Sequence, residues 1–316
     1  MNIIERAVRR LKTAEVVQAP RATEVIEERR PVPPIPSAPA ASSRRRANSE
    51  VEFNQRSVPW PKRVTPIDGP SAEIDPAMLE RAGMILPGGR RTQISEEFRA
   101  IKRGLLQVAK QADSGQARSN NMIMVTSAFP NEGKTFSSIN LALSMSLELD
   151  HSVLLVDADV ARAERFDFLG LSSGTGLMDL LLDPERSLEQ TIIRTNIDRL
   201  DVLLAGSHQQ QASELLASES MSRLLDRLAA QGPDRIVILD GPPLLVTTEA
   251  RTLAHRAGRV VIVVEADRTP QAALKAALAQ LEGCSVFGLL NKRAGSPSGD
   301  VFNYGSYKYG GEKLHV

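Results

Sequence analysis

The strongest structural signal in this 316-residue chain is the run Ser127-Ala128-Phe129-Pro130-Asn131-Glu132-Gly133-Lys134-Thr135. The run follows an apolar stretch at 122–126 and precedes a helical pattern at 136–149. Such a turn between a strand and a helix suits phosphate groups, because backbone N–H groups and the positive end of the helix point into it. The sequence therefore predicts a phosphate-binding loop here, although Ala128 stands where the usual pattern has its first glycine.

Individual residues of this loop have distinct expected roles. Lys134 is expected to reach the β- and γ-phosphate oxygens, and the Thr135 hydroxyl to bind Mg²⁺. The other residues that we expect to contact the nucleotide here are Phe129, Pro130, Asn131, Glu132, Gly133 and Phe136. A Gly-Lys-Thr triplet alone is weak evidence, so the prediction depends on its place between strand and helix.

Beyond the loop, apolar runs alternate with helical stretches. The further apolar runs lie at 153–156, 201–204, 236–239, 260–264 and 286–290, and the further helical stretches at 213–230 and 270–281. The runs are continuous rather than alternating, which is typical of strands that are buried on both faces. Repeated alternation of strand and helix predicts an α/β fold, a mostly parallel sheet that is flanked by helices.

Three aspartates follow two of the predicted strands directly. Asp157 and Asp159 end the second strand, and Asp240 ends another strand within Leu239-Asp240-Gly241-Pro242-Pro243. Ligands of open parallel sheets bind outside the carboxyl ends of the strands, so these carboxylates are expected beside the phosphate loop. Asp157 and Asp240 would then hold Mg²⁺, directly or through water. The alternative is that the aspartates only cap the helices that follow.

Proline content divides the chain. Eleven of the 19 prolines lie between Pro20 and Pro76, a composition that favours extended conformations over a packed core. We expect a basic amphipathic helix at 1–17, a disordered linker at 18–74, the folded domain at 75–295 and a flexible tail at 296–316. The first helix either contacts a membrane surface or a partner, or rests on its own domain.

Composition excludes several classes of protein. Cys284 is the single cysteine, so an internal disulfide framework and a multi-cysteine metal site are excluded. Lys and Arg number 39 against 38 Asp and Glu, which gives no reason to expect nucleic acid as a partner. The sequence has neither a run of about 18 apolar residues nor a secretory signal pattern. We expect an intracellular protein.

Taken in order, the phosphate loop, Val156-Asp157-Ala158-Asp159 and Leu239-Asp240-Gly241-Pro242-Pro243 resemble the three Walker-type motifs of bacterial tyrosine kinases. These kinases are relatives of the deviant-Walker ATPases of the MinD and ParA type. Partition ATPases carry a signature lysine five positions before the loop lysine, where this chain has Phe129. That difference favours the kinases.

Two further stretches resemble the same family. Glu96, Arg99 and Lys102 are similar to the kinases' Glu-x-x-Arg-x-x-Arg oligomerisation helix, with lysine in place of the last arginine. Residues at a spacing of three are expected on one helical face. An Ile-Ile-Glu start, Glu-Glu-Phe-Arg-x-Ile-Lys-Arg and Asp-Ala-Asp-Val-Ala-Arg resemble the cytosolic autokinases of exosortase-linked exopolysaccharide loci. This resemblance covers residues 1–16 and about 75–309.

The resemblance implies an ATP- and Mg²⁺-dependent protein-tyrosine autokinase. Lys134, Asp157, Asp159 and Asp240 would be its catalytic residues, with Asp159 acting on the acceptor hydroxyl. Asn291, after the last predicted strand, would contact the adenine. The acceptors would be Tyr304, Tyr307 and Tyr309, which are all the tyrosines of the chain.

The resemblance also implies partners and a biological role. We expect transfer between subunits of a homo-oligomer, a separate membrane chain-length or co-polymerase protein as activator, and a tyrosine phosphatase. The kinase would be cytoplasmic, recruited to the inner face of the cell membrane, and would regulate exopolysaccharide synthesis, export and chain length. Two alternatives stay open: a partition-type ATPase that switches conformation without tyrosine phosphorylation, and a non-catalytic adaptor that binds nucleotide.

Overall fold

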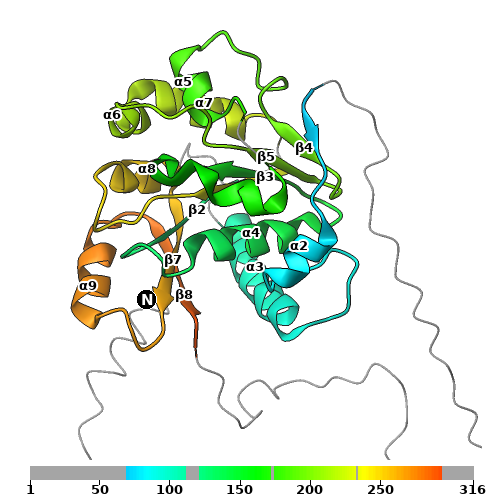
Figure 1. Ribbon diagram of the computed structural model, residues 1–316. Helices are drawn as coiled ribbons and strands as arrows, with labels where there is room; N and C mark the ends of the chain where they lie inside the picture. Colours follow the sequence, from blue (N-terminus) through cyan, green and yellow to red (C-terminus); the bar gives the residue numbers. More distant parts are fainter. Residues whose placement is uncertain (1–68, 112–120, 172–173, 233, 294–316) are drawn as a thin grey trace, which may run out of the picture. The chain divides into compact units, whose positions relative to one another are not determined.

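The computed structural model describes residues 69–111, 121–171, 174–232 and 234–293 (Figure 1). The predicted helix at 1–17, nearly all of the predicted linker and the predicted tail at 296–316 lie outside the described residues. The described residues therefore belong almost entirely to the predicted folded domain.

Eight strands form one sheet in the order β1-β4-β5-β3-β6-β2-β7-β8. They are β1 (Ser71–Ala72), β2 (Met122–Ser127), β3 (Ser152–Asp157), β4 (Ile193–Thr195), β5 (Leu200–Leu203), β6 (Arg235–Asp240), β7 (Arg259–Glu265) and β8 (Ser285–Asn291). All neighbours from β5 to β8 in that order are parallel, whereas β4 is antiparallel to β5. The predicted α/β fold with a mostly parallel sheet is confirmed.

Helices cover both faces of this sheet (Figure 1). They are α2 (Pro76–Arg81), α3 (Gln93–Gln111), α4 (Lys134–Ser146), α5 (Leu177–Leu182), α6 (Ala212–Ala217), α7 (Glu219–Ala229), α8 (Glu249–Ala257) and α9 (Gln271–Ala279), with a 3₁₀ helix η1 at Val160–Leu169. On β3, Val153 and Leu155 face the core under α3 and α4, and Leu154 and Val156 face the core under α5, α7 and α8. Because successive side chains of a strand point to opposite faces, a strand covered on both sides must be apolar throughout.

The structure differs from the sequence-based expectation in the outer parts of the sheet. Ser71–Ala72, which the composition assigned to the linker, pair with β4, and Ile74 is buried. The folded part therefore begins before residue 75. At the other edge, β8 is only half-buried, and Leu290 is 63% exposed, because an edge strand is covered less completely than a central one.

The predicted helix at 213–230 is two helices, α6 and α7, that meet at Ser218. The backbone of Ser218 is extended, with φ −75° and ψ 164°, and its Oγ accepts a hydrogen bond from the N–H of Met221. Ser218 thus acts as the N-cap of α7, a role in which serine satisfies a helical N–H that has no backbone partner. The apolar periodicity continues across this break and conceals it in the sequence.

Strand order brings the predicted site together. Although β2 and β3 are successive in the first half of the domain, β6 lies between them in the sheet. Asp240 at the end of β6 is in register with Val125 of β2 on one side and with Asp157 of β3 on the other. The phosphate loop after β2 and both acidic motifs therefore meet at one edge of the sheet.

Candidate active site

The phosphate loop connects β2 to α4 through a tight turn with two residues of positive φ. These are Asn131, with φ 67°, and Gly133, with φ 97°, which directly precedes Lys134, the first residue of α4. A Cβ on Gly133 would lie 1.9 Å from Asn291 Nδ2. Both the backbone conformation and the close approach of Asn291 therefore require glycine at this position.

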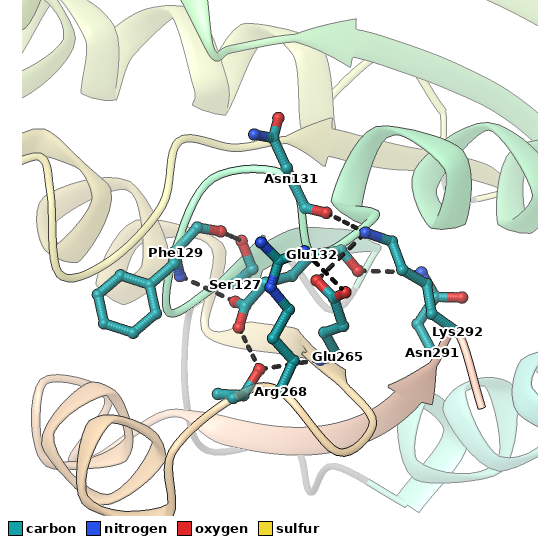
Figure 2. A network of polar contacts seen from close by, with 9 residues as sticks. Ser127, Phe129, Asn131, Glu132, Glu265, Arg268, Asn291 and Lys292 are labelled. Carbon is teal, nitrogen blue, oxygen red and sulfur yellow. Dashed lines mark hydrogen bonds and ion pairs between the residues drawn. The ribbon is translucent and has the colours of Figure 1, made fainter. Parts of the chain in front are cut away.

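Glu132 holds the loop from inside. Its side chain is buried, and one carboxylate oxygen accepts a hydrogen bond from Phe129 N at 2.8 Å while the other accepts one from Thr269 Oγ1. The Glu132 carbonyl accepts a further bond from Asn291 Nδ2 at 2.9 Å. Figure 2 shows this network. The Glu132 carboxylate therefore stabilises the conformation of the loop through its bonds to Phe129 and Thr269.

A second set of contacts ties the loop to the ends of β7 and β8. Lys292, just past β8, donates to the Asn131 carbonyl and pairs with Glu265 at 3.2 Å (Figure 2). Arg268 pairs with the same carboxylate at 3.3 Å. Although desolvation opposes the effect, hydrogen bonds from Lys292 and Arg268 hold the pKa of Glu265 below its ordinary value. The loop is thus braced against the β7–β8 side of the site.

The two strand-terminal carboxylates lie on the opposite side of the loop. Asp157 and Asp240 are fully buried cross-strand neighbours, and Ala158 N donates to the Asp240 carbonyl at 3.0 Å. The segment after β6 is joined to β2, because Thr126 Oγ1 donates to the Pro242 carbonyl at 2.6 Å. It is also joined to the phosphate loop, because Leu245 N donates to the Ala128 carbonyl at 3.2 Å. Both acidic motifs are therefore fixed relative to the loop.

Asp159 pairs directly with the loop lysine. Its Oδ2 lies 2.7 Å from Lys134 Nζ, and the two side chains are only 5% and 6% exposed. The first turn of α4 and the segment after β3 are thus connected by a buried ion pair. Such a pair is strongly sensitive to the loss of either partner, because the remaining charge would be left uncompensated.

The groups predicted to hold Mg²⁺ fit that ion in their chemistry. Thr135, Asp157 and Asp240 offer hydroxyl and carboxylate oxygens, which are the hard ligands that Mg²⁺ prefers. Among the described residues, no group of three or more His, Cys, Asp or Glu side chains could hold a metal ion alone. Mg²⁺ commonly binds through one or two carboxylates together with substrate phosphates, and Asp157 and Asp240 are two neighbouring carboxylates at this edge of the sheet.

Other predicted residues lie apart from this cluster. Phe129 is 38% exposed on the loop, whereas Phe136 packs against the core beneath α3 and α4. Glu96 and Arg99 form an exposed ion pair at 3.1 Å on α3, but Lys102 is buried and directed toward α4. The predicted acceptors Tyr304, Tyr307 and Tyr309 lie outside the described residues.

Thr269 contributes to this site although no sequence signal predicted it. It lies in the turn between β7 and α9, 137 residues from Glu132, and it has no motif around it. The role of Lys292 in the site could have been recognised from the sequence, because Lys292 directly follows Asn291.

Among the described residues, no helix combines the length and the apolar character that crossing a bilayer would require.

Comparison with known proteins agrees with this architecture. A family model described as an AAA domain matches residues 122–283. Tyrosine-protein kinase YwqD of Bacillus subtilis is 30% identical over 215 residues, which cover 67% of this chain and 86% of YwqD. EpsB of Ralstonia nicotianae, provisionally classed as a tyrosine-protein kinase, is 34% identical over 218 residues, covering 68% of this chain. The chain spans only 26% of the length of EpsB.

Solved structures give the same result. The BceF tyrosine kinase domain has a TM-score of 0.56 and 25% identity, covering 71% of this chain and 92% of that domain. The chimerical protein CapA2B2 has a TM-score of 0.54 and 25% identity, with 71% and 93% of the two chains covered. The fold and the loop define a P-loop nucleotide-binding domain. Within that class, this chain belongs to the family of bacterial tyrosine-protein kinases.

Proposed function

We propose that this chain is an ATP- and Mg²⁺-dependent protein-tyrosine autokinase. The observation that carries the proposal is the convergence of Lys134, Asp157, Asp159 and Asp240 at one edge of the sheet, beside a loop of phosphate-binding geometry. Kinases with the same domain provide independent support, since YwqD aligns with this chain over 86% of its length.

In this proposal the residues act mainly by positioning and by neutralising charge. The N-terminal end of α4 and Lys134 bind the β- and γ-phosphates, and Thr135, Asp157 and Asp240 hold Mg²⁺. Bound Mg²⁺ neutralises developing charge on the phosphate oxygens. The acceptor oxygen attacks the γ-phosphorus as the bond to the ADP oxygen breaks, and the phenolic proton passes to Asp159. Since tyrosine has a pKa of about 10, Asp159 acts chiefly by orienting the hydroxyl until bond cleavage is advanced.

The ion pair between Lys134 and Asp159 links phosphate binding by Lys134 to the action of Asp159 on the acceptor hydroxyl, and it sets their order. An incoming γ-phosphate competes with Asp159 for the Lys134 ammonium, which lies 2.7 Å from that carboxylate. When the lysine turns to the phosphate, the carboxylate becomes available to the acceptor hydroxyl. Nucleotide binding and preparation of the acceptor site would therefore be coupled through one exchange of partners.

The proposed acceptors are Tyr304, Tyr307 and Tyr309, reached in a neighbouring subunit of a homo-oligomer. The test mixes a Lys134→Met chain with an intact tail and an active chain in which these three tyrosines are phenylalanine. Phosphate on the inactive chain is the expected result. An unlabelled inactive chain, in a mixture shown to co-assemble, would rule out transfer between subunits.

The resemblance to exopolysaccharide autokinases supplies the biological part of the proposal. The kinase would be recruited to the inner membrane face by a separate chain-length or co-polymerase protein and reversed by a tyrosine phosphatase. Its phosphorylation state would regulate polysaccharide synthesis and export. Each phosphate adds about −1.5 to −2 charges, so phosphorylated tails would repel one another and loosen the assembly.

One experiment separates the kinase from its two alternatives. The full chain is incubated with labelled Mg·ATP, and phosphotyrosine and released inorganic phosphate are measured in parallel. A kinase forms phosphotyrosine, and a switch ATPase releases phosphate without it. A nucleotide-binding adaptor does neither. Release of inorganic phosphate without phosphotyrosine would refute the kinase proposal and identify the chain as a switch ATPase.

A further inference from the structure

Lys102 occupies the last position of the predicted oligomerisation set, but its side chain points into the domain. It is only 6% exposed, its Nζ donates to the Ser144 carbonyl at 2.8 Å, and it forms an ion pair with the Glu148 carboxylate. Glu96 and Arg99 pair with each other on the exposed surface of the same helix. The set is therefore divided between two sides of α3.

Helix geometry explains this division. At about 100° per residue, a step of three residues falls about 60° short of a full turn, and two such steps fall about 120° short. Glu96 and Arg99 can share one face, but Lys102 is rotated a third of a turn away from Glu96. On an amphipathic helix whose other side is buried, that rotation takes Lys102 to the interface with α4. The expectation that all three residues share one face is therefore incorrect.

The contacts of Lys102 lie at the C-terminal end of the helix that carries the phosphate loop. The last turn of α4 has no basic residue of its own, and the carbonyls of a helix end carry a partial negative charge. Lys102 supplies the missing positive charge from α3 and satisfies the carbonyl of Ser144. At the opposite end of the same helix, the first turn holds Lys134 and Thr135.

Glu148 completes this arrangement just beyond the end of α4. The hydrogen bond from Lys102 holds the pKa of Glu148 below its ordinary value, and the charges of Lys102, His151 and Arg103 act in the same direction. The Glu148 side chain is 41% exposed, so solvent screens the pair from that side. The bond to the Ser144 carbonyl is buried, so of the two Lys102 contacts it is the less screened and the one that ties α3 directly to α4.

We propose that Lys102 is a positioning residue for the nucleotide site. It fixes the C-terminal end of α4 to α3 and thereby holds the first turn of α4, with Lys134 and Thr135, in place for the phosphates. It makes this contact within one subunit, whereas Glu96 and Arg99 are left for contacts between subunits. The inference rests on the proposed nucleotide site and adds a residue that acts on it through another element.

The test uses the full chain with Lys102→Met, which keeps most of the aliphatic stem and removes the charge. Three quantities are measured: the melting temperature, the Kd of Mg·ADP well below that temperature, and the molecular mass in solution. Because the variant loses a buried hydrogen bond from a charged group, we expect the melting temperature to fall by about 5 °C. The Kd should rise about 3- to 10-fold while the mass matches that of the unaltered chain.

Two control variants separate positioning from general effects. Lys275→Met makes the same substitution at an exposed site on α9 and should change none of the three quantities. Asp201→Asn breaks the Arg235–Asp201 ion pair, which joins β5 to the start of β6, away from the site. It should lower the melting temperature without changing the Kd, as a purely structural defect would.

A lower mass with unchanged melting temperature and Kd would overturn the inference, because it would make Lys102 a contact between subunits. An unchanged Kd with a lower melting temperature, as in Asp201→Asn, would also overturn it and leave a structural brace. If Lys102→Met does not fold, Glu148→Gln is measured instead, and a Kd identical to that of the unaltered chain counts against the inference. Failure of the unaltered chain to bind Mg·ADP would refute the proposed nucleotide site itself, while mass and melting temperature still locate the Lys102 contact.

Discussion

Lys134 and Asp159 form a buried ion pair across the candidate site, with Nζ and Oδ2 separated by 2.7 Å. One residue opens α4 and the other follows β3, so the pair connects the phosphate-binding element with the element proposed to face the acceptor. Because a phosphate oxygen is an alternative partner for the lysine, the two proposed functions of the site share a single charge. A substitution at Asp159 can therefore separate the effect on nucleotide binding from the effect on phosphate transfer.

Asp159→Asn should slow phosphotyrosine formation much more than it weakens nucleotide binding. The change removes the group that faces the acceptor and also removes a competitor of the phosphate for Lys134, so the Kd of Mg·ADP should stay equal or fall. Without nucleotide, the unpaired buried lysine should destabilise the fold by about 3 kcal/mol. Calorimetric binding and single-turnover rates measure the two effects separately. Comparable losses in affinity and rate would instead make Asp159 a metal ligand or a structural residue.

Gly133→Ala should disrupt the loop for two separable reasons. Positive φ costs a residue with a Cβ about 1–2 kcal/mol, and the new methyl group would displace Asn291 from its bond to the Glu132 carbonyl. Adding Asn291→Ala relieves the clash but not the backbone strain, so thermal unfolding should show partial recovery. Gly104→Ala on α3, where a Cβ meets no atom within 4 Å, is the control and should be neutral or stabilising. Full recovery in the double variant would show that backbone strain is unimportant.

Thr269→Val should weaken nucleotide binding although Thr269 is not expected to touch the nucleotide. Valine has nearly the same shape but cannot donate to the buried Glu132 carboxylate, which then keeps the hydrogen bond from the Phe129 N–H. A bond to a charged group is worth about 1.5–3 kcal/mol, and a loss of about 1.4 kcal/mol raises Kd tenfold. Titration with Mg·ADP measures the change, with Thr252→Val on α8 as control. An unaltered Kd would show that Glu132 does not depend on this contact.

We expect the stability of the folded chain to depend slightly on pH because of the Glu148 carboxylate. Its pKa is lowered in the folded chain by the hydrogen bond from Lys102, so it stabilises the fold above the pKa of an unfolded glutamate. That contribution is lost as the pH falls through the lowered folded value, and exposure of Glu148 keeps it below about 1 kcal/mol. In urea unfolding, the difference between the unaltered chain and Glu148→Gln should be present at pH 7 and shrink below about pH 5. A difference that grows in acid would contradict the assignment.

The sequence predicted the central part of the fold and the placement of the site, because both depend on local patterns. The strands that carry Ser127, Asp157 and Asp240 are continuous apolar runs, and parallel pairing brings their carboxyl ends to one edge. No such local rule identifies Thr269. Its contact with Glu132 arises only when the turn after β7 packs against the phosphate loop.

Two further differences have equally physical causes. Lys102 was expected on the same face of α3 as Glu96 and Arg99, but the rotation of the helix over the six residues from Glu96 takes it into the interface with α4. Ser218 divides a continuous helical pattern because it caps the start of α7. Serine is a common N-cap residue, but the apolar periodicity that continues across Ser218 conceals this helix start. In both cases the sequence pattern is present, but the structure that it was expected to form is not: the three residues do not share one face, and the apolar periodicity does not form one helix.

Lys134 and the carboxylates around it are proposed to transfer phosphate from ATP to tyrosine. The most direct test incubates the full chain and its Lys134→Met variant with Mg·ATP and measures phosphotyrosine by mass spectrometry, after circular dichroism has shown that both are folded. We predict phosphotyrosine at one or more of Tyr304, Tyr307 and Tyr309 in the unaltered chain and none in the variant. Phosphotyrosine at equal levels in both chains, or in neither, would contradict the account.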